Sequence, residues 1–189
     1  MTSKASILLC TTAAAAVAAA TASALHSSSP GADAVERGRY LVTAMGCNDC
    51  HTPWHLGKNG PEPDMTRRLS GHPATFVMPP APTPSAEWPV SVGATNTAWS
   101  GPWGTSFTAN LTPDPETGLG KWTVDEFVAA LRTGRHQGRG RQILPPMPYP
   151  FIGTLTDADL QAVFAYLQSI PAITNKVPEP MPPAGQRKG

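Results

Sequence analysis

The run Cys47-Asn48-Asp49-Cys50-His51 constrains this chain more than any other feature of its sequence. Two thiols three positions apart can each add across one vinyl group of the same porphyrin, and the adjacent imidazole can then bind the iron. The C-x-x-C-H spacing is the attachment pattern of c-type haem. We therefore predict one covalent haem c, with Cys47 and Cys50 as its attachment points and His51 as an iron ligand.

Other kinds of site also use a C-x-x-C pair, and the sequence argues against each of them. A thioredoxin-like redox pair expects a βαβ pattern, which this chain lacks. A zinc site needs further ligands, but there is no second C-x-x-C pair and no H-x-x-x-H partner. A disulfide across so short a loop would be strained. The histidine that directly follows the pair, together with an export signal upstream, favours the covalent haem.

Residues 1–24 have the features of a secretory signal peptide: a basic residue at Lys4, an alanine-rich apolar run, and the small-residue cleavage pattern Ala22–Ala24. We expect cleavage before Leu25 and a periplasmic location. The alternative is an uncleaved anchor that faces the periplasm, because the apolar run approaches the roughly 20 residues that span a bilayer. Its many alanines make it a poor transmembrane segment, so membrane contact is expected only if the segment stays uncleaved.

The rest of the chain is expected to hold one domain. Residues 25–32 are predicted to form a flexible leader, residues 33–172 a single domain, and residues 173–189 a Pro-rich tail. About 165 of the 189 residues would remain after cleavage, which is enough for one hydrophobic core. The formal charge of the full chain is only +1, so the composition gives no sign of nucleic-acid binding.

Three helices are predicted, each between a capping residue and a stop residue: Asp33 to Gly46, Thr123 to Gly134, and Thr156 to Pro171. Gly38 either weakens the first helix or lets another helix approach it closely. Residues 52–118 are rich in Pro, Gly, Ser and Thr and show no sustained periodicity. We expect them to wrap the haem irregularly, with disorder of residues 79–95 as the alternative. The predicted fold class is mostly α: a helical domain around one haem, with a long irregular Pro/Trp-rich insertion.

The chain resembles the class I cytochromes c, and four groups of residues carry the likeness: Glu36–Leu41; Gly46–Pro53; Asn110–Asp114 with Gly118–Thr123; and Pro146–Pro148 with Asp159–Leu167. In particular, it is similar to the single-haem cytochrome c modules that serve periplasmic or membrane-bound bacterial dehydrogenases. The resemblance implies a helical fold whose first and last helices cross near the haem edge, with Gly38 and Tyr40 packed against Phe164, Tyr166 and Leu167. It also implies a periplasmic dehydrogenase as electron donor, and an oxidase or another cytochrome as acceptor.

The second axial ligand of the iron decides between two functions. Met147 is flanked by Pro146 and Pro148, which stiffen its backbone, and it precedes the last helix, where the family places its methionine ligand. Met78, also next to a proline, is the alternative sixth ligand, and either side chain could instead fill a gap in the core. His/Met ligation predicts one-electron transfer without substrate chemistry. An open sixth position predicts a haem enzyme or a gas-binding protein.

The chain has one dense basic run, which consists of Arg132, Arg135, His136, Arg139 and Arg141. Two interpretations of this run are open. It can be a solvated loop, or it can pair with a haem propionate and steer an acidic partner toward the haem edge. Trp122 and Tyr149 can likewise hydrogen-bond propionates or belong to the core. A further possibility is that the chain is a dedicated subunit of a dehydrogenase complex, with the long insertion as its interface.

Overall fold

The computed structural model describes residues 30–183. Within this range the chain forms five α-helices: α1 (Pro30–Ala44), α2 (Cys47–His51), α3 (Val124–Thr133), α4 (Tyr149–Ile152) and α5 (Asp157–Ser169). It also forms five short strands: β1 (Trp54–Gly57), β2 (Gly60–Pro63), β3 (Ser91–Val92), β4 (Ala98–Gly101) and β5 (Gly104–Phe107). Two 3-10 turns, η1 (Met65–Arg67) and η2 (His136–Gly138), complete the secondary structure. None of the described helices is long and apolar enough to cross a lipid bilayer.

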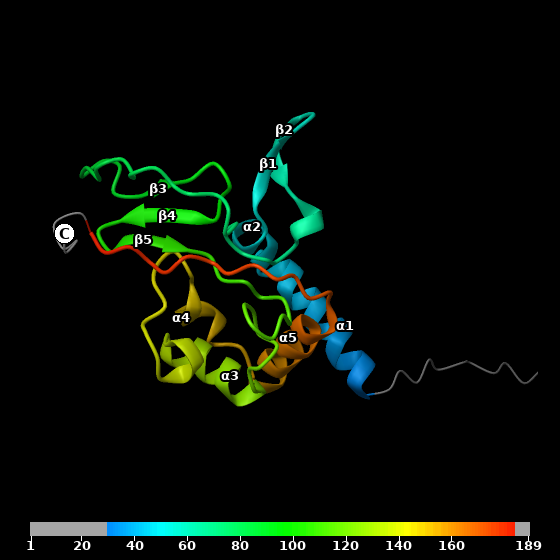
Figure 1. Ribbon diagram of the computed structural model, residues 1–189. Coiled ribbons are helices and arrows are strands. Elements are labelled where there is room, and N and C mark those ends of the chain that lie inside the picture. The colour runs from blue at the N-terminus through cyan, green and yellow to red at the C-terminus, as the bar shows by residue number, and fades with distance from the viewer. Residues whose placement is uncertain (1–29, 184–189) are drawn as a thin grey trace, which may run out of the picture.

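The expectation of a mostly α fold needs correction, because the structure is mixed, with 34% of its residues in helices and 14% in strands. All five strands lie in the segment that was expected to be irregular. β1 and β2 form a hairpin that projects from α2, while β3, β4 and β5 form an antiparallel sheet in that order (Figure 1). The strands are two to four residues long, too short for an alternation of polar and apolar residues to stand out.

The first and last helices of the described chain, α1 and α5, lie side by side in direct contact (Figure 1). A Cβ atom at Gly38 would lie 1.9 Å from the carbonyl oxygen of Ala162 and 2.7 Å from Cβ of Tyr166. The interpretation of Gly38 as a point of close helix approach is therefore confirmed. The expected packing of Tyr40 is wrong, since this side chain is 58% exposed and the buried Leu41 faces the core instead.

The predicted helix ends agree with the structure. The hydroxyl of Thr123 accepts a hydrogen bond from the Glu126 amide and the Glu126 carboxylate accepts one from the Thr123 amide, so the capping box before α3 is complete. Gly134 ends α3 in the left-handed region, at φ 66°. Only the start of α1 differs from the prediction: the helix begins at Pro30, a residue that suits a first helical turn.

The C-terminal segment after α5 runs back across the molecule and passes beside β5 (Figure 1), where Met181 pairs with Thr105. Its buried anchor is Asn175, which has an exposed fraction of 6%. The Asn175 amide donates to the carbonyl oxygens of Ser70 (2.7 Å) and His72 (2.9 Å), and its own oxygen accepts from the amide of Ala74 (2.9 Å). The segment thereby holds the loop around residues 70–74 in place.

A second anchor of the C-terminal segment is the buried carboxylate of Asp114. Its Oδ1 accepts hydrogen bonds from the amide (2.7 Å) and the hydroxyl (2.6 Å) of Thr117, and its Oδ2 accepts one from the hydroxyl of Thr174 (2.7 Å). These hydrogen bonds favour the ionised form, with the Thr117 hydroxyl contributing most, and they lower the pKa of Asp114 to about 2.

We predict that Gly38→Ala lowers the free energy of unfolding by about 1–3 kcal/mol, because its methyl group must push apart two helix backbones in contact. Urea denaturation of the holoprotein measures the change. Gly31→Ala is the matched control on the same helix, since a Cβ atom there would meet nothing within 4 Å. Equal losses for the two variants would contradict the close-contact explanation.

We predict that Asp114→Asn removes part of the acid sensitivity of folding. The folded-state pKa of Asp114 lies below the value of about 3.9 expected in the unfolded chain. Its stabilising effect is therefore complete above about pH 4 and is lost as the pH falls toward 2. Thermal unfolding between pH 2 and pH 6 should show a deficit in the variant that shrinks as the pH falls. Glu116→Gln is the control, because Glu116 belongs to the same loop but is exposed. A pH-independent deficit in Asp114→Asn would contradict the prediction.

Candidate functional site

The short helix α2 brings together the three residues of the haem-attachment motif. Gly46, at φ 66°, turns the chain from α1 into α2. Cys47, Cys50 and His51 then occupy positions i, i+3 and i+4 of one helix, so they share a face. Both thiols are free and partly exposed, whereas His51 is only 7% exposed. This arrangement fits two covalent attachment points beside one buried iron ligand.

The His51 imidazole is held in a defined orientation. Its Nδ1 lies 2.8 Å from the carbonyl oxygen of Ala109, and because a carbonyl can only accept, Nδ1 carries the proton and donates it. The lone pair of the neutral ring is therefore on Nε2. Burial lowers the pKa of His51, which keeps the ring neutral near pH 7. A neutral imidazole whose Nδ1–H is held by a carbonyl is prepared to bind a metal through Nε2.

This hydrogen bond depends on Gly71, which sequence reasoning missed. The Gly71 amide donates to the His51 carbonyl oxygen at 2.8 Å. Gly71 has φ +76°, and a Cβ atom there would lie 2.4 Å from the carbonyl oxygen of Thr108 and 2.6 Å from the carbonyl carbon of Ala109. Glycine is thus needed for the Ala109 backbone to approach His51. Gly71 is the single glycine between Gly60 and Gly93, but no helical or strand periodicity around it indicated that the backbone needs a left-handed conformation there.

The two thiols are neutral in the free chain. Burial raises the pKa of Cys47 to about 11, and it also raises the pKa of Cys50. The charge of Asp49, between them in sequence, raises the pKa of both thiols further. Covalent attachment of a haem would convert both sulfurs to thioethers, which do not titrate and suit partly buried positions.

Met147 lies in a loop that is tied to the sheet. The hydroxyl of Ser106 in β5 donates to the Pro145 carbonyl oxygen at 2.5 Å. The partly buried Met147 side chain packs against the hydrophobic core that includes Leu131, Leu160 and Leu167, and Cys47 packs against the same core. The structure thus places the predicted sixth ligand and the first attachment cysteine against one shared core.

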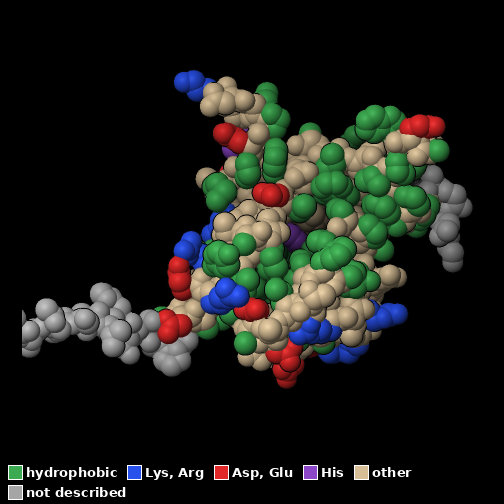
Figure 2. Space-filling model, turned by 180° about the vertical axis from the view of Figure 1, so that it is seen from behind, with side chains coloured by type: hydrophobic (Ala, Val, Ile, Leu, Met, Phe, Trp, Pro, Cys, Tyr) green, Lys and Arg blue, Asp and Glu red, His purple; other side chains and the backbone are tan. Residues whose placement is uncertain are grey.

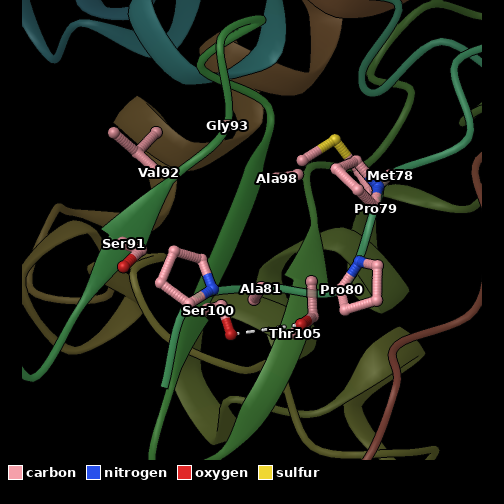
Figure 3. A pocket seen from close by; sticks show the side chains of 11 residues that line it. Met78, Pro79, Pro80, Ala81, Ser91, Val92, Gly93, Ala98, Ser100 and Thr105 are labelled. Carbon is pink, nitrogen blue, oxygen red and sulfur yellow. Dashed lines mark hydrogen bonds between the residues drawn. The ribbon is translucent and has the colours of Figure 1, made fainter. Parts of the chain in front are cut away.

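Met78 has a different environment. It lines a small pocket formed by residues 78–82 and by β3, β4 and β5 (Figure 3). A Cβ atom at Gly93 would lie only 2.7 Å from the Met78 methyl group, and the sulfur is also close to this position. Figure 3 shows the thioether beside Ala98 at one end of the pocket. The Met78 side chain therefore packs against Gly93 and Ala98 in the sheet region.

Histidines other than His51 also have partners in residues 30–183. His72 is fully buried: its Nε2–H donates to the Phe76 carbonyl oxygen, and its Nδ1 accepts from the Thr97 hydroxyl, both at 2.9 Å. His136 lies edge-on to Trp122, with the ring centroids 4.8 Å apart. His55, on the β1–β2 hairpin, lies 3.4 Å from a carboxylate oxygen of Glu62.

The basic run is largely engaged within the chain. Arg132 donates to the carbonyl oxygens of Gly153 and Leu155 and pairs with Asp157 at 2.6 Å. Two further ion pairs join Arg139 to Glu126 (2.9 Å) and Arg141 to Glu179 (3.6 Å). Arg135 donates to a backbone carbonyl. Tyr149 packs against Gly134, where a Cβ atom would lie 2.3 Å from its ring. The contacts of the four arginines thus stabilise the loop after α3.

On the face shown in Figure 2, hydrophobic side chains gather around a hollow in which a histidine side chain is visible. A porphyrin requires hydrocarbon against its faces and an imidazole for its iron, and the buried His51 with the core that Cys47 packs against offers both. The α2 residues, the oriented His51 ring and the adjoining core all fit a covalently attached haem.

No protein-family model matches the chain. It is 32% identical over 144 residues to a nicotinate dehydrogenase subunit of Pseudomonas putida, covering 76% of this chain and 9% of that protein. It is 28% identical over 159 residues to the cytochrome c subunit of alcohol dehydrogenase (quinone) of Gluconobacter oxydans, covering 82% and 26%. It is 29% identical over 136 residues to the fructose dehydrogenase cytochrome subunit of Gluconobacter japonicus, covering 72% and 21%.

The chain thus spans about a quarter or less of the length of these relatives, so the likeness concerns one module within each of them. Two of the three relatives are named as cytochrome subunits of dehydrogenases. This agrees with the attachment motif in α2 and with the oriented imidazole of His51. The chain is a c-type cytochrome module, similar to the cytochrome c subunits of bacterial dehydrogenases.

Proposed function

We propose that this chain transfers one electron at a time through a single haem c, attached to Cys47 and Cys50, with His51 and Met147 as axial ligands. The observation that carries the proposal is the buried, neutral His51 ring, held by Ala109 so that Nε2 is available. When bound, the haem supplies a reversible iron(III)/iron(II) couple. The chain supplies the fixed ligands and a site from which water is largely excluded.

The surroundings of the candidate ligands support Met147 as the sixth ligand. Met78 packs against Gly93 in the sheet region, and both ring nitrogens of His72 already have hydrogen-bond partners. Met65 is 58% exposed on η1. Met147 is partly buried against the core that Cys47 also contacts, in a loop fixed by Ser106. A thioether ligand opposite imidazole raises the reduction potential, which suits a protein that accepts electrons.

We further propose that the electron donor is a dehydrogenase, because the relatives are named as dehydrogenase subunits. The acceptor is then an oxidase or another cytochrome. The proposed location is the periplasm, and the predicted signal peptide at residues 1–24 lies outside the described residues. The rival function is a haem enzyme or gas-binding protein, which requires an open sixth iron position.

We predict one covalent haem per chain. Pyridine haemochrome absorbance relative to protein mass should give a ratio of one, and the haem should remain with the chain in acidified acetone. The double variant Cys47→Ala/Cys50→Ala should release its haem under the same treatment. Cys10→Ala is the control, because the third cysteine of the sequence lies in the predicted signal peptide. Haem extracted from the unmutated protein would disprove covalent attachment.

We predict that the unmutated holoprotein has a low-spin optical spectrum that carbon monoxide does not change. Met147→Ala should lose the methionine–iron absorption band and bind carbon monoxide, because the sixth position becomes open. Met78→Leu is the matched control and should keep the band. Loss of the band in Met78→Leu alone would assign the ligand to Met78. A high-spin spectrum of the unmutated protein that shifts with carbon monoxide would support the rival function.

A further inference from the structure

A positively charged side chain lies against the haem-attachment motif. Arg68 follows η1, and its Nε donates to the side-chain oxygen of Asn48 at 3.0 Å. Asn48 belongs to the C-x-x-C-H motif, directly after Cys47. The Arg68 guanidinium also lies over the buried ring of Tyr166 in α5, 5.6 Å from its centroid. Two contacts therefore hold this cation between α2 and α5.

The charge of Arg68 is not neutralised by a carboxylate. None of the ion pairs within residues 30–183 includes Arg68, and its two contacts are to an amide oxygen and to an aromatic ring. The side chain is also half-buried. Water and salt therefore screen this charge less than they screen a charge on the open surface.

The motif itself contains a charge of opposite sign. Asp49 lies between the two cysteines in sequence and is exposed. Its carboxylate lies near the start of α2, since a Cβ atom at Gly46 would be 3.0 Å from Oδ2 of Asp49. The short helix α2 thus has a half-buried cation held against it at Asn48 and carries an exposed anion at Asp49.

Fixed charges shift a reduction potential in a known direction. Oxidation adds one positive charge to the iron, so a nearby cation opposes oxidation and raises the potential, whereas a nearby anion lowers it. The effect increases with burial because the effective dielectric constant falls. Arg68 and Asp49 therefore act in opposite directions, and the half-buried Arg68 acts more strongly.

We propose that Arg68 and Asp49 tune the reduction potential of the haem attached to α2, with Arg68 raising the potential and Asp49 lowering it. This inference rests on the proposed electron-transfer function. It assigns to Arg68 a role as a fixed cation, held in place by Asn48 and Tyr166, in addition to any contribution to stability.

The test is an equilibrium redox titration of the holoprotein, followed by its optical spectrum with soluble mediators, for four variants. Arg68→Gln removes the cation, whereas Arg68→Lys keeps the charge and loses the planar fork of donors. Asp49→Asn removes the anion. Lys121→Gln is the control, because Lys121 is exposed and paired with Glu116. The same spectra report the spin state and hence the axial ligation.

Arg68→Gln should lower the reduction potential. At a fixed ambient potential, the ratio of oxidised to reduced haem should rise at least about threefold, which corresponds to a drop of about 28 mV at 59 mV per tenfold change in the ratio. Arg68→Lys should stay near the unmutated value, Asp49→Asn should shift upward by a smaller amount, and Lys121→Gln should not shift. Added salt should reduce the Asp49 shift more than the Arg68 shift.

Three results would overturn the inference: no shift in Arg68→Gln, equal shifts in Arg68→Gln and Arg68→Lys, or shifts of the same sign in Arg68→Gln and Asp49→Asn. Equal shifts in the two Arg68 variants would indicate a loosened site, because Arg68→Lys keeps the charge. Shifts of the same sign in Arg68→Gln and Asp49→Asn would indicate the same, because disorder does not depend on the sign of the charge removed. Thermal unfolding of each variant measures that loosening separately. If the unmutated protein is high-spin, the proposed function fails instead, and the spectrum distinguishes the two failures.

Discussion

The hydrogen bond from His51 Nδ1–H to the Ala109 carbonyl is the interaction on which the site depends. It fixes the tautomer of a buried ring, leaves Nε2 available, and joins parts of the chain that are 58 residues apart. It exists because Gly71 lets residues 108 and 109 pass directly over the haem-attachment segment. The loops after α2 therefore do more than connect helices, since they set the orientation and the protonation of the proposed iron ligand.

The sequence predicted the features that depend on neighbouring residues. The capping box at Thr123 and Glu126 is satisfied within one helical turn, so its pattern is visible in the sequence alone. Gly38 stood out because glycine is unfavourable inside a helix, and the approach of α5 explains it. The strands could not be predicted, because each is stabilised by a partner across a turn and has too few residues for an apolar period.

The same distinction holds for the site. The C-x-x-C-H spacing alone predicts the chemistry of Cys47, Cys50 and His51, and α2 places these residues on one face. Gly71, Ala109 and Arg68 contribute through partners 20 or more residues away along the chain, and two of them act through backbone atoms that every residue has. The Ala109 carbonyl orients His51 only because the fold brings the two together. Since every residue has a carbonyl, its role cannot be predicted from a sequence pattern.

The C-terminal segment has a consequence for the order in which the molecule assembles. Asn175 bonds to Ser70 and His72, on both sides of Gly71 and 105 and 103 residues away in sequence. Contacts of such separation form late, after the local helices have formed. The loop around Gly71 has other contacts, to His51, Thr97 and Thr108, whose partners lie closer in sequence, and the contacts to Asn175 are expected to follow them. Docking of the C-terminal segment thus fixes the backbone on both sides of Gly71, the residue whose amide donates to the His51 carbonyl oxygen.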